Sequence, residues 1–173
     1  MRRRSLLLAL PVASACASGG LEAPNEVRID EHWVSAGQPT RAGLLRLRAL
    51  GFERVLYLAP SSVGDAIPDE PSLVRAQGLR FDHVPIPWAT PELAHVDAVF
   101  AVLKDWPAEG RGLVHCQVNM RASVLVFLHR VLVRGHDPER AWTAVSKVWT
   151  PEGRWRVLIA AALQRGGVRF EPL

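Results

Sequence analysis

LVHCQVNMRAS, residues 113–123, is the most informative stretch of this 173-residue sequence. A short apolar run leads through a more polar turn into residues 124–132, which are almost wholly apolar. A short apolar run between turn residues is typical of a buried parallel strand, and the longer run after it predicts a buried helix. The stretch therefore predicts a central strand that passes through a tight loop directly into a helix.

Turn residues divide the rest of the chain into alternating strand and helix patterns. We expect strands at 26–35, 54–58, 79–86 and 112–115, and helices at 40–50, 69–78, 91–105, 121–134, 138–149 and 152–165. Short apolar strands separated by helices favour parallel pairing with helices on both faces. The pattern predicts an α/β fold, in which a single mainly parallel sheet of about four to five strands is flanked by helices.

Three similar triplets predict helix starts. Residues 90–92, 137–139 and 150–152 read TPE, DPE and TPE. Each offers a capping oxygen, a proline for the first helical position and a carboxylate near the positive end of the helix dipole. The pattern therefore gives each of these glutamates a structural role.

The N-terminus differs in character from the rest of the chain. Residues 1–15 combine an arginine-rich start, a short apolar run and a small-residue cleavage pattern, which predicts a secretory signal. Because this segment resembles a lipoprotein signal, Cys16 is a candidate lipid anchor and simple cleavage is the alternative. Residues 16–25 would form a tether and 26–173 the folded domain. The protein is then exported, either periplasmic or lipid-anchored to a bacterial membrane.

Composition narrows the range of partners. The apolar content of 49% with 22% charged residues suits one folded domain. Removing the three signal arginines lowers the formal net charge from +4 by 3, to +1, which argues against nucleic acid as a partner. The histidines, at 32, 83, 95, 115, 129 and 136, show no metal-ligand spacing. No metal site and no cofactor are expected, and the oligomeric state stays open.

Cys116 is the candidate nucleophile. It lies at the start of the tight loop, where backbone N–H groups and the following helix dipole form an anion-binding cradle. The same field lowers the pKa of a thiol and favours the reactive thiolate. Arg121 follows and can place its planar guanidinium on two oxygens of a tetrahedral anion. The cradle would use the backbone N–H groups of Gln117, Val118, Asn119, Met120 and Arg121.

His115-Cys116 followed by Arg121 resembles the signature of the cysteine-based protein tyrosine and dual-specificity phosphatases. Residues 35–39 (SAGQP), 51–55 (GFERV) and 83–87 (HVPIP) are similar to a bacterial branch of that superfamily. The resemblance implies a phosphatase that hydrolyses phosphate monoesters of a protein or a small molecule through a phosphocysteine intermediate. It gives Cys116 the role of nucleophile and Arg121 the role of phosphate ligand, and His115 would orient the site.

The loop departs from that signature in two ways. Four residues separate Cys116 from Arg121, one fewer than in the phosphatase pattern, and the loop has no glycine. Asn119 can replace the glycine, because asparagine tolerates a left-handed backbone. The shorter spacing is also that of rhodanese-like sulfurtransferases, which carry a persulfide on the cysteine. A sulfurtransferase and a non-catalytic anion-binding module therefore remain alternatives.

The general acid is harder to place. The resemblance puts an aspartate on the loop after the preceding strand, where this chain has Trp88. Glu92 is the nearest carboxylate on that loop and is the general-acid candidate, ahead of Asp82, His95 and Asp97. Without an acid, leaving groups of low pKa would still react, since they need little protonation. Aryl phosphates would then be hydrolysed far faster than alkyl phosphates.

Overall fold

The structure, a computed structural model, describes residues 20–106 and 109–171. Five strands form one sheet in the order β1-β2-β5-β3-β4, in which β1 is antiparallel and the other four are parallel. The strands are β1 (Val27–Arg28), β2 (Trp33–Ala36), β3 (Phe52–Tyr57), β4 (Arg80–His83) and β5 (Arg111–His115). The predicted α/β fold, with one mainly parallel sheet of four to five strands flanked by helices, is confirmed.

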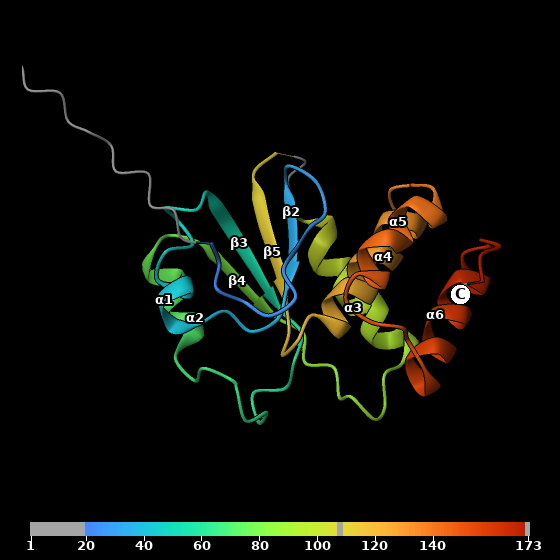
Figure 1. Cartoon of the computed structure of the whole chain (residues 1–173), viewed down its shortest axis with the longest axis horizontal. Helices are drawn as coiled ribbons and strands as arrows, with labels where there is room; N and C mark the ends of the chain where they lie inside the picture. Colours follow the sequence, from blue (N-terminus) through green and yellow to red (C-terminus); the bar gives the residue numbers. More distant parts are fainter. Residues whose placement is uncertain (1–19, 107–108, 172–173) are drawn as a thin grey trace, which may run out of the picture.

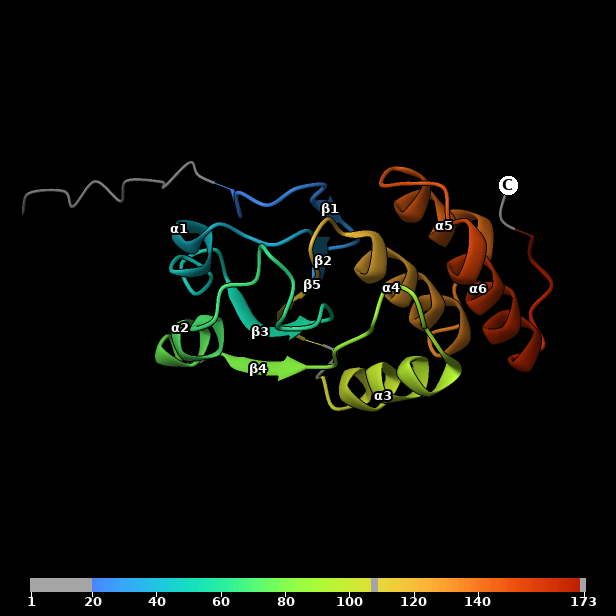
Figure 2. The same cartoon turned by 90° about the horizontal axis from the view of Figure 1, so that it is seen from below.

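Helices cover both faces of the sheet (Figures 1 and 2). They are α1 (Arg41–Leu44), α2 (Glu70–Ala76), α3 (Leu93–Lys104), α4 (Met120–Leu132), α5 (Pro138–Ser146) and α6 (Gly153–Arg165). The first two lie on one face, α3 and α4 lie on the other, and α5 and α6 pack outside α4. Ten of the thirteen residues of α4 are buried, which explains why its sequence is almost wholly apolar. Within the described residues, no helix has the length and apolar composition needed to cross a membrane.

Several helix boundaries differ from the sequence prediction. Asp137 caps α5 as predicted, its side chain accepting a hydrogen bond from the backbone of Arg140 at 2.8 Å. The other two triplets do not place proline inside the helix: α3 begins two residues and α6 one residue later than predicted, with Glu92 and Glu152 at the N-cap. The helix expected at 40–50 continues beyond Leu44 as turns held mostly by i to i+3 bonds.

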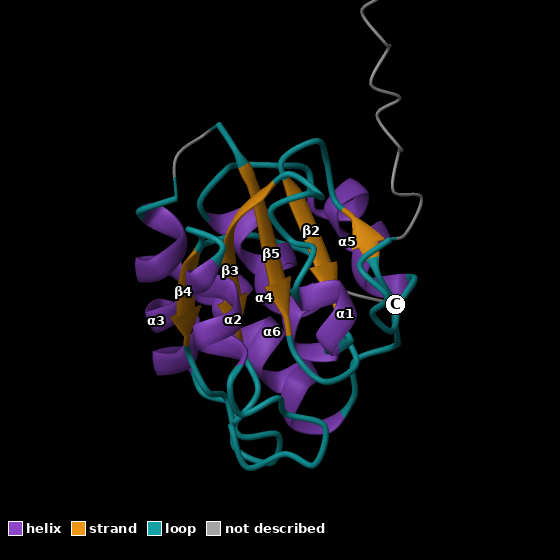
Figure 3. Cartoon of the chain, turned by 90° about the vertical axis from the view of Figure 1, so that its left-hand side faces the viewer, coloured by secondary structure: helices purple, strands orange, loops and turns teal. Residues whose placement is uncertain are grey.

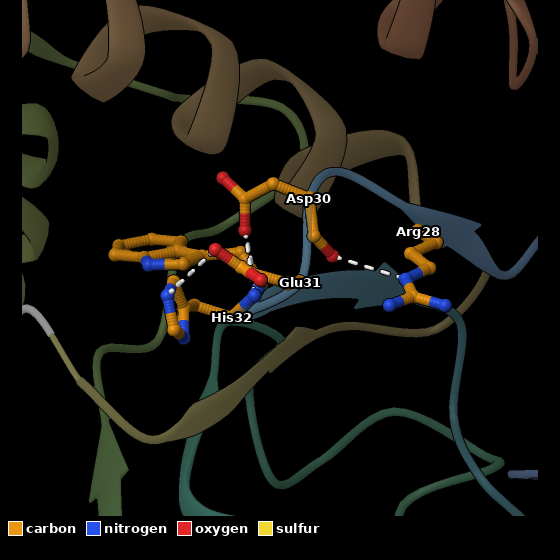
Figure 4. Close-up of polar contacts among 5 residues, drawn as sticks. Arg28, Asp30, Glu31 and His32 are labelled. Carbon is orange, nitrogen blue, oxygen red and sulfur yellow. Dashed lines mark hydrogen bonds and ion pairs between the residues drawn. The ribbon is translucent and has the colours of Figure 1, made fainter.

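A tight turn joins β1 to β2 (Figure 4). The Asp30 carboxylate accepts hydrogen bonds from the backbone N–H groups of His32 and Trp33, both at 2.8 Å. Arg28 Nε donates to the Asp30 carbonyl at 3.2 Å, and His32 lies 3.3 Å from Glu31. An aspartate that bonds the backbone two and three residues on closes a turn without further tertiary contacts. It splits the single strand expected at 26–35 into an antiparallel pair.

The parallel strands place their carboxyl ends at one edge of the sheet, and long loops gather there (Figure 3). In open parallel sheets, ligands bind at this edge. Residues 1–19 lie outside the described residues, so the predicted signal and the anchor at Cys16 do too. From residue 20 the expected tether packs against the domain: Leu21 is buried in the core, and the Pro24 carbonyl accepts a hydrogen bond from Gly37 at 2.7 Å.

Candidate active site

Cys116 lies immediately after β5, at the loop-rich edge of the sheet. Its backbone N–H donates to the carbonyl of Ala36 at 3.2 Å, which continues the pairing of β5 with β2 by one residue. The side chain is fully buried, and α4 begins four residues later at Met120. The strand, loop and helix predicted from residues 113–123 are therefore present, with the thiol close to the N-terminus of a thirteen-residue helix.

Asn119 shapes the loop. Its φ is 69°, the left-handed conformation predicted for a residue that replaces the loop glycine. Its Nδ2 donates to the Asn25 carbonyl at 2.6 Å and to Ser35 Oγ at 3.1 Å. The Asn25 side chain in turn donates to the Val118 carbonyl at 3.0 Å. The N-terminal segment and β2 thus hold the loop by side-chain hydrogen bonds.

Gly37 and Gln38, which follow β2, pack against the loop that carries Cys116. The backbone N–H of Gln38 donates to the Gln117 carbonyl at 2.8 Å. A Cβ atom at Gly37 would lie 2.7 Å from that same carbonyl oxygen and 2.9 Å from the carbonyl oxygen of Pro24. Position 37 therefore requires glycine, because the loop and the N-terminal segment approach it closely on two sides. The SAGQP stretch at 35–39 therefore holds the loop in place through these close backbone contacts.

Arg121 folds back toward the loop. Its side chain is buried, Nε donates to the Ile86 carbonyl at 2.9 Å, and Nη1 donates to Gln117 Oε1 at 3.4 Å. Its Cζ lies 5.2 Å from the centre of the Trp88 ring. The guanidinium is therefore held between the loops that follow β4 and β5. Within the described part of the chain its Nη2 group makes no hydrogen bond, so those donors can face an anion.

His115 points to the opposite face of the sheet from α4, as strand alternation requires. Its Nε2 lies 2.7 Å from Glu70 Oε1, and both side chains are buried. Glu70 Oε2 also accepts from Gln38 Nε2 at 2.8 Å. The Tyr57 ring stacks on His115 on one side and on His83 on the other. This network fixes the end of β5 directly before the thiol.

The pKa of the Tyr57 hydroxyl is sensitive to the groups around the site. Burial raises its pKa well above the ordinary value, and electrostatic interactions with Glu70, Asp65 and Cys116 raise it further. Arg121 acts in the opposite direction. The carboxylate of Asp65 and the thiol of Cys116 therefore both lie within electrostatic reach of one buried hydroxyl.

Three tryptophans form a wall beside the loop. Trp88 packs on Trp149 and Trp155 with ring centres 5.5 and 5.2 Å away, and Trp155 Nε1 donates to the Trp88 carbonyl at 3.1 Å. Trp88 is 43% exposed, although it also covers Arg121. A pocket of about 570 Å³ opens here and is lined by all three rings together with Met120 and Arg154. It offers an aromatic surface next to the candidate anion site.

The predicted general-acid candidate has a structural role. Glu92 is the exposed N-cap of α3, and its backbone N–H donates to His95 Nδ1 at 3.0 Å within a capping box. Asp82 and Asp97 each form an ion pair with an arginine. The hydrogen bond from Arg165 lowers the pKa of Asp97. The described contacts join none of these side chains to the loop that carries Cys116.

Asp65 is the site residue that sequence reasoning missed. It is exposed on the loop after β3, and its Oδ1 accepts a hydrogen bond from Gln117 Nε2 at 2.9 Å. The signal available was the topology, because carboxyl ends of neighbouring parallel strands meet at one edge. A carboxylate after β3 therefore faces the loop after β5. Among the described residues, no three His, Cys, Asp or Glu side chains gather as a metal site.

Comparison with known proteins adds an independent line of evidence. No family model and no curated relative matches the chain. Solved structures do match. The chain is structurally similar to a candidate phosphatase of known structure.

A candidate phosphatase (DUF442) from Shewanella putrefaciens CN-32 is 27% identical, with a TM-score of 0.75 over 83% of this chain and 93% of that chain. Tk-PTP in its active form is 19% identical, with a TM-score of 0.66 over 82% and 97%. A cysteine-to-serine variant of P. aeruginosa TpbA in complex with pTyr is 18% identical, with a TM-score of 0.59 over 79% and 81%. The last two similarities concern the fold alone.

Proposed function

We propose that this protein is a cysteine-dependent phosphatase that hydrolyses phosphate monoesters through a phosphocysteine intermediate. The observation that carries the proposal is the arrangement of one loop: Cys116 begins it, α4 follows it, and Arg121 folds back toward it, with no hydrogen bond from Nη2 to the described residues. The similarity to the candidate phosphatase from Shewanella putrefaciens supports the same reaction.

In the proposed reaction, the Cys116 thiolate attacks phosphorus and the bond to the leaving oxygen breaks. Arg121 and the backbone N–H groups of residues 117–121 hold the equatorial oxygens as charge moves onto them. The α4 dipole stabilises both the thiolate and the bound anion. Water then attacks phosphorus, the sulfur–phosphorus bond breaks, and the thiolate is restored.

The proposed substrate is a phosphorylated protein or small molecule. TpbA was solved with pTyr, which is consistent with a phosphorylated substrate here. The tryptophan-lined pocket beside Arg121 can accept the part of the substrate that leaves with the oxygen. Aromatic rings favour stacking with a planar group, so an aryl leaving group fits this wall.

The spacing of the loop favours one alternative. Four residues separate Cys116 from Arg121, which is the rhodanese-like spacing. In that case Cys116 would carry a persulfide and pass the sulfur to an acceptor. The same cradle would then bind the thiosulfate anion.

One pair of assays separates the two activities. Wild type and Cys116→Ser are compared with para-nitrophenyl phosphate and with thiosulfate-to-cyanide transfer. We expect phosphate release by wild type only, because the serine hydroxyl does not ionise near neutral pH. Thiosulfate transfer without phosphate release would favour the sulfurtransferase. Equal phosphate release by the two proteins would contradict both assignments.

We propose further that residues 1–15 direct export and that Cys16 is either lipidated or close to the cleavage site. The arginine-rich start and the small residues before Cys16 support this proposal. Mass spectrometry of the N-terminal peptide from cell fractions tests it. A mature chain that begins at Met1 in the cytoplasm would contradict export.

A further inference from the structure

We propose that Asp65 is the general acid and base of this site, reaching the reacting oxygen from the loop after β3. This inference rests on the proposed phosphatase function and concerns the same site. The acid was expected on the loop after β4, but Trp88 occupies that position. Asp65 would supply the carboxylate from the loop after β3 instead.

The first support is direct contact with the anion loop. Asp65 Oδ1 accepts from Gln117 Nε2 at 2.9 Å, and Gln117 Oε1 accepts from Arg121 Nη1 at 3.4 Å. One glutamine side chain therefore joins the carboxylate to the guanidinium. Asp65 Oδ2 is not used by this bond, so it can approach an oxygen of an anion bound by the loop.

The second support is availability. Asp65 is exposed, so it can exchange protons with solvent. Two other acidic groups near this edge are engaged: Glu70 is buried against His115 and Gln38, and Asp69 binds Arg41 through both carboxylate oxygens. In the described part of the chain, Asp65 is not within ion-pair distance of a cation. Electrostatic interactions with both Asp65 and Cys116 contribute to the raised pKa of Tyr57.

The third support is the pair of side chains that contact Arg121. Trp88 covers Arg121 and packs into the tryptophan wall, so the loop after β4 presents an aromatic face there. Gln117 also contacts Arg121, and its amide nitrogen donates to Asp65. A leaving group seated between them would stack on Trp88 and present its bridging oxygen to Asp65.

The proton transfers follow from this placement. In the first step the Cys116 sulfur bonds to phosphorus, the bond to the leaving oxygen breaks, and the Asp65 carboxyl gives its proton to that oxygen. In the second step the Asp65 carboxylate takes a proton from water as the water oxygen bonds to phosphorus. The sulfur–phosphorus bond breaks with return of the thiolate, and Asp65 regains its starting form.

The test compares leaving groups of different pKa on Asp65→Asn and on Glu92→Gln. A general acid matters most for leaving groups of high pKa and contributes about 10²–10⁴-fold. We expect Asp65→Asn to lower kcat/KM for an alkyl phosphate by about 100-fold or more and for para-nitrophenyl phosphate by less than about 10-fold. Glu92→Gln should leave the ratio of the two substrates at the wild-type value. Thermal unfolding confirms that both variants fold.

The outcomes keep this inference separate from the phosphatase proposal. One outcome is that Cys116→Ser abolishes turnover while Asp65→Asn lowers kcat/KM equally for both substrates or for neither. In that case the phosphatase proposal stands and Asp65 is not the acid. If Glu92→Gln gives the selective loss, the acid lies on the loop after β4. If wild type turns over neither substrate, both the phosphatase proposal and the inference are overturned.

Discussion

Gly37 lies where three chain segments meet, and a single methyl group tests how closely the anion loop is supported. In Gly37→Ala the new Cβ would lie 2.7 Å from the Gln117 carbonyl oxygen, so the loop must shift. We expect a stability loss of about 1–3 kcal/mol, typical of overpacking, together with a fall in kcat/KM. Urea unfolding and the para-nitrophenyl phosphate assay measure the two effects.

Gly20→Ala is the matched control, since the nearest atom to its Cβ is 4.0 Å away. It should match wild type in both measurements. If Gly37→Ala also matches wild type, the proposed support of the loop by residues 35–39 is wrong.

The candidate site was predictable at the residue level only where contacts are local. The strand-to-helix stretch around Cys116 and the left-handed Asn119 could both be predicted from neighbours in sequence. Asp65 contacts Gln117 across 52 positions, and Asn25 contacts Val118 across 93. Such pairs depend on the order of strands in the sheet, which no local pattern specifies.

At the scale of the element, α4 begins from a strained residue. Asn119 has φ 69°, and a left-handed backbone costs about 1–2 kcal/mol for a residue with Cβ and no compensating side-chain bond. We expect Asn119→Ala to be less stable than Asn119→Gly by about 1–2 kcal/mol, because only glycine adopts this conformation freely. Urea unfolding of both variants measures the difference, and equal stabilities would contradict the role of backbone strain.

Element boundaries show which local signals were reliable. The strand and helix order followed from apolar periodicity and turn residues, and Asp137 capped α5 as predicted. The threonines at 90 and 150 are not at the N-cap, because Glu92 and Glu152 occupy that position in α3 and α6. In α3 the capping box with His95 explains the later start. A cap depends on which side chain closes the turn, and several candidates lay within three residues.

At the scale of the whole molecule, a buried histidine makes stability depend on pH. His129 stacks on Trp33, and burial lowers its pKa to about 4, with smaller contributions from the positive charges of Arg134 and His136. Between its ordinary pKa of 6.5 and about 4, only the unfolded chain takes up this proton, so the free energy of unfolding falls as the pH falls. The loss is at most about 3 kcal/mol.

Urea unfolding between pH 7 and pH 4 tests this dependence, with His129→Phe as the comparison because a phenyl ring preserves the packing on Trp33. The variant should lose less stability than wild type over this range. Parallel curves for the two proteins would show that His129 does not account for the acid dependence.

The central claim concerns one bond, between sulfur and phosphorus, and rapid acid quench tests it directly. Wild-type protein is mixed with para-nitrophenyl phosphate, quenched within the first turnovers, digested and analysed by mass spectrometry. The account predicts one phosphoryl group on the peptide that contains Cys116, and none on the same peptide of Cys116→Ser. An unmodified Cys116 peptide during continuing phosphate release, or a phosphoryl group on another residue, would contradict it.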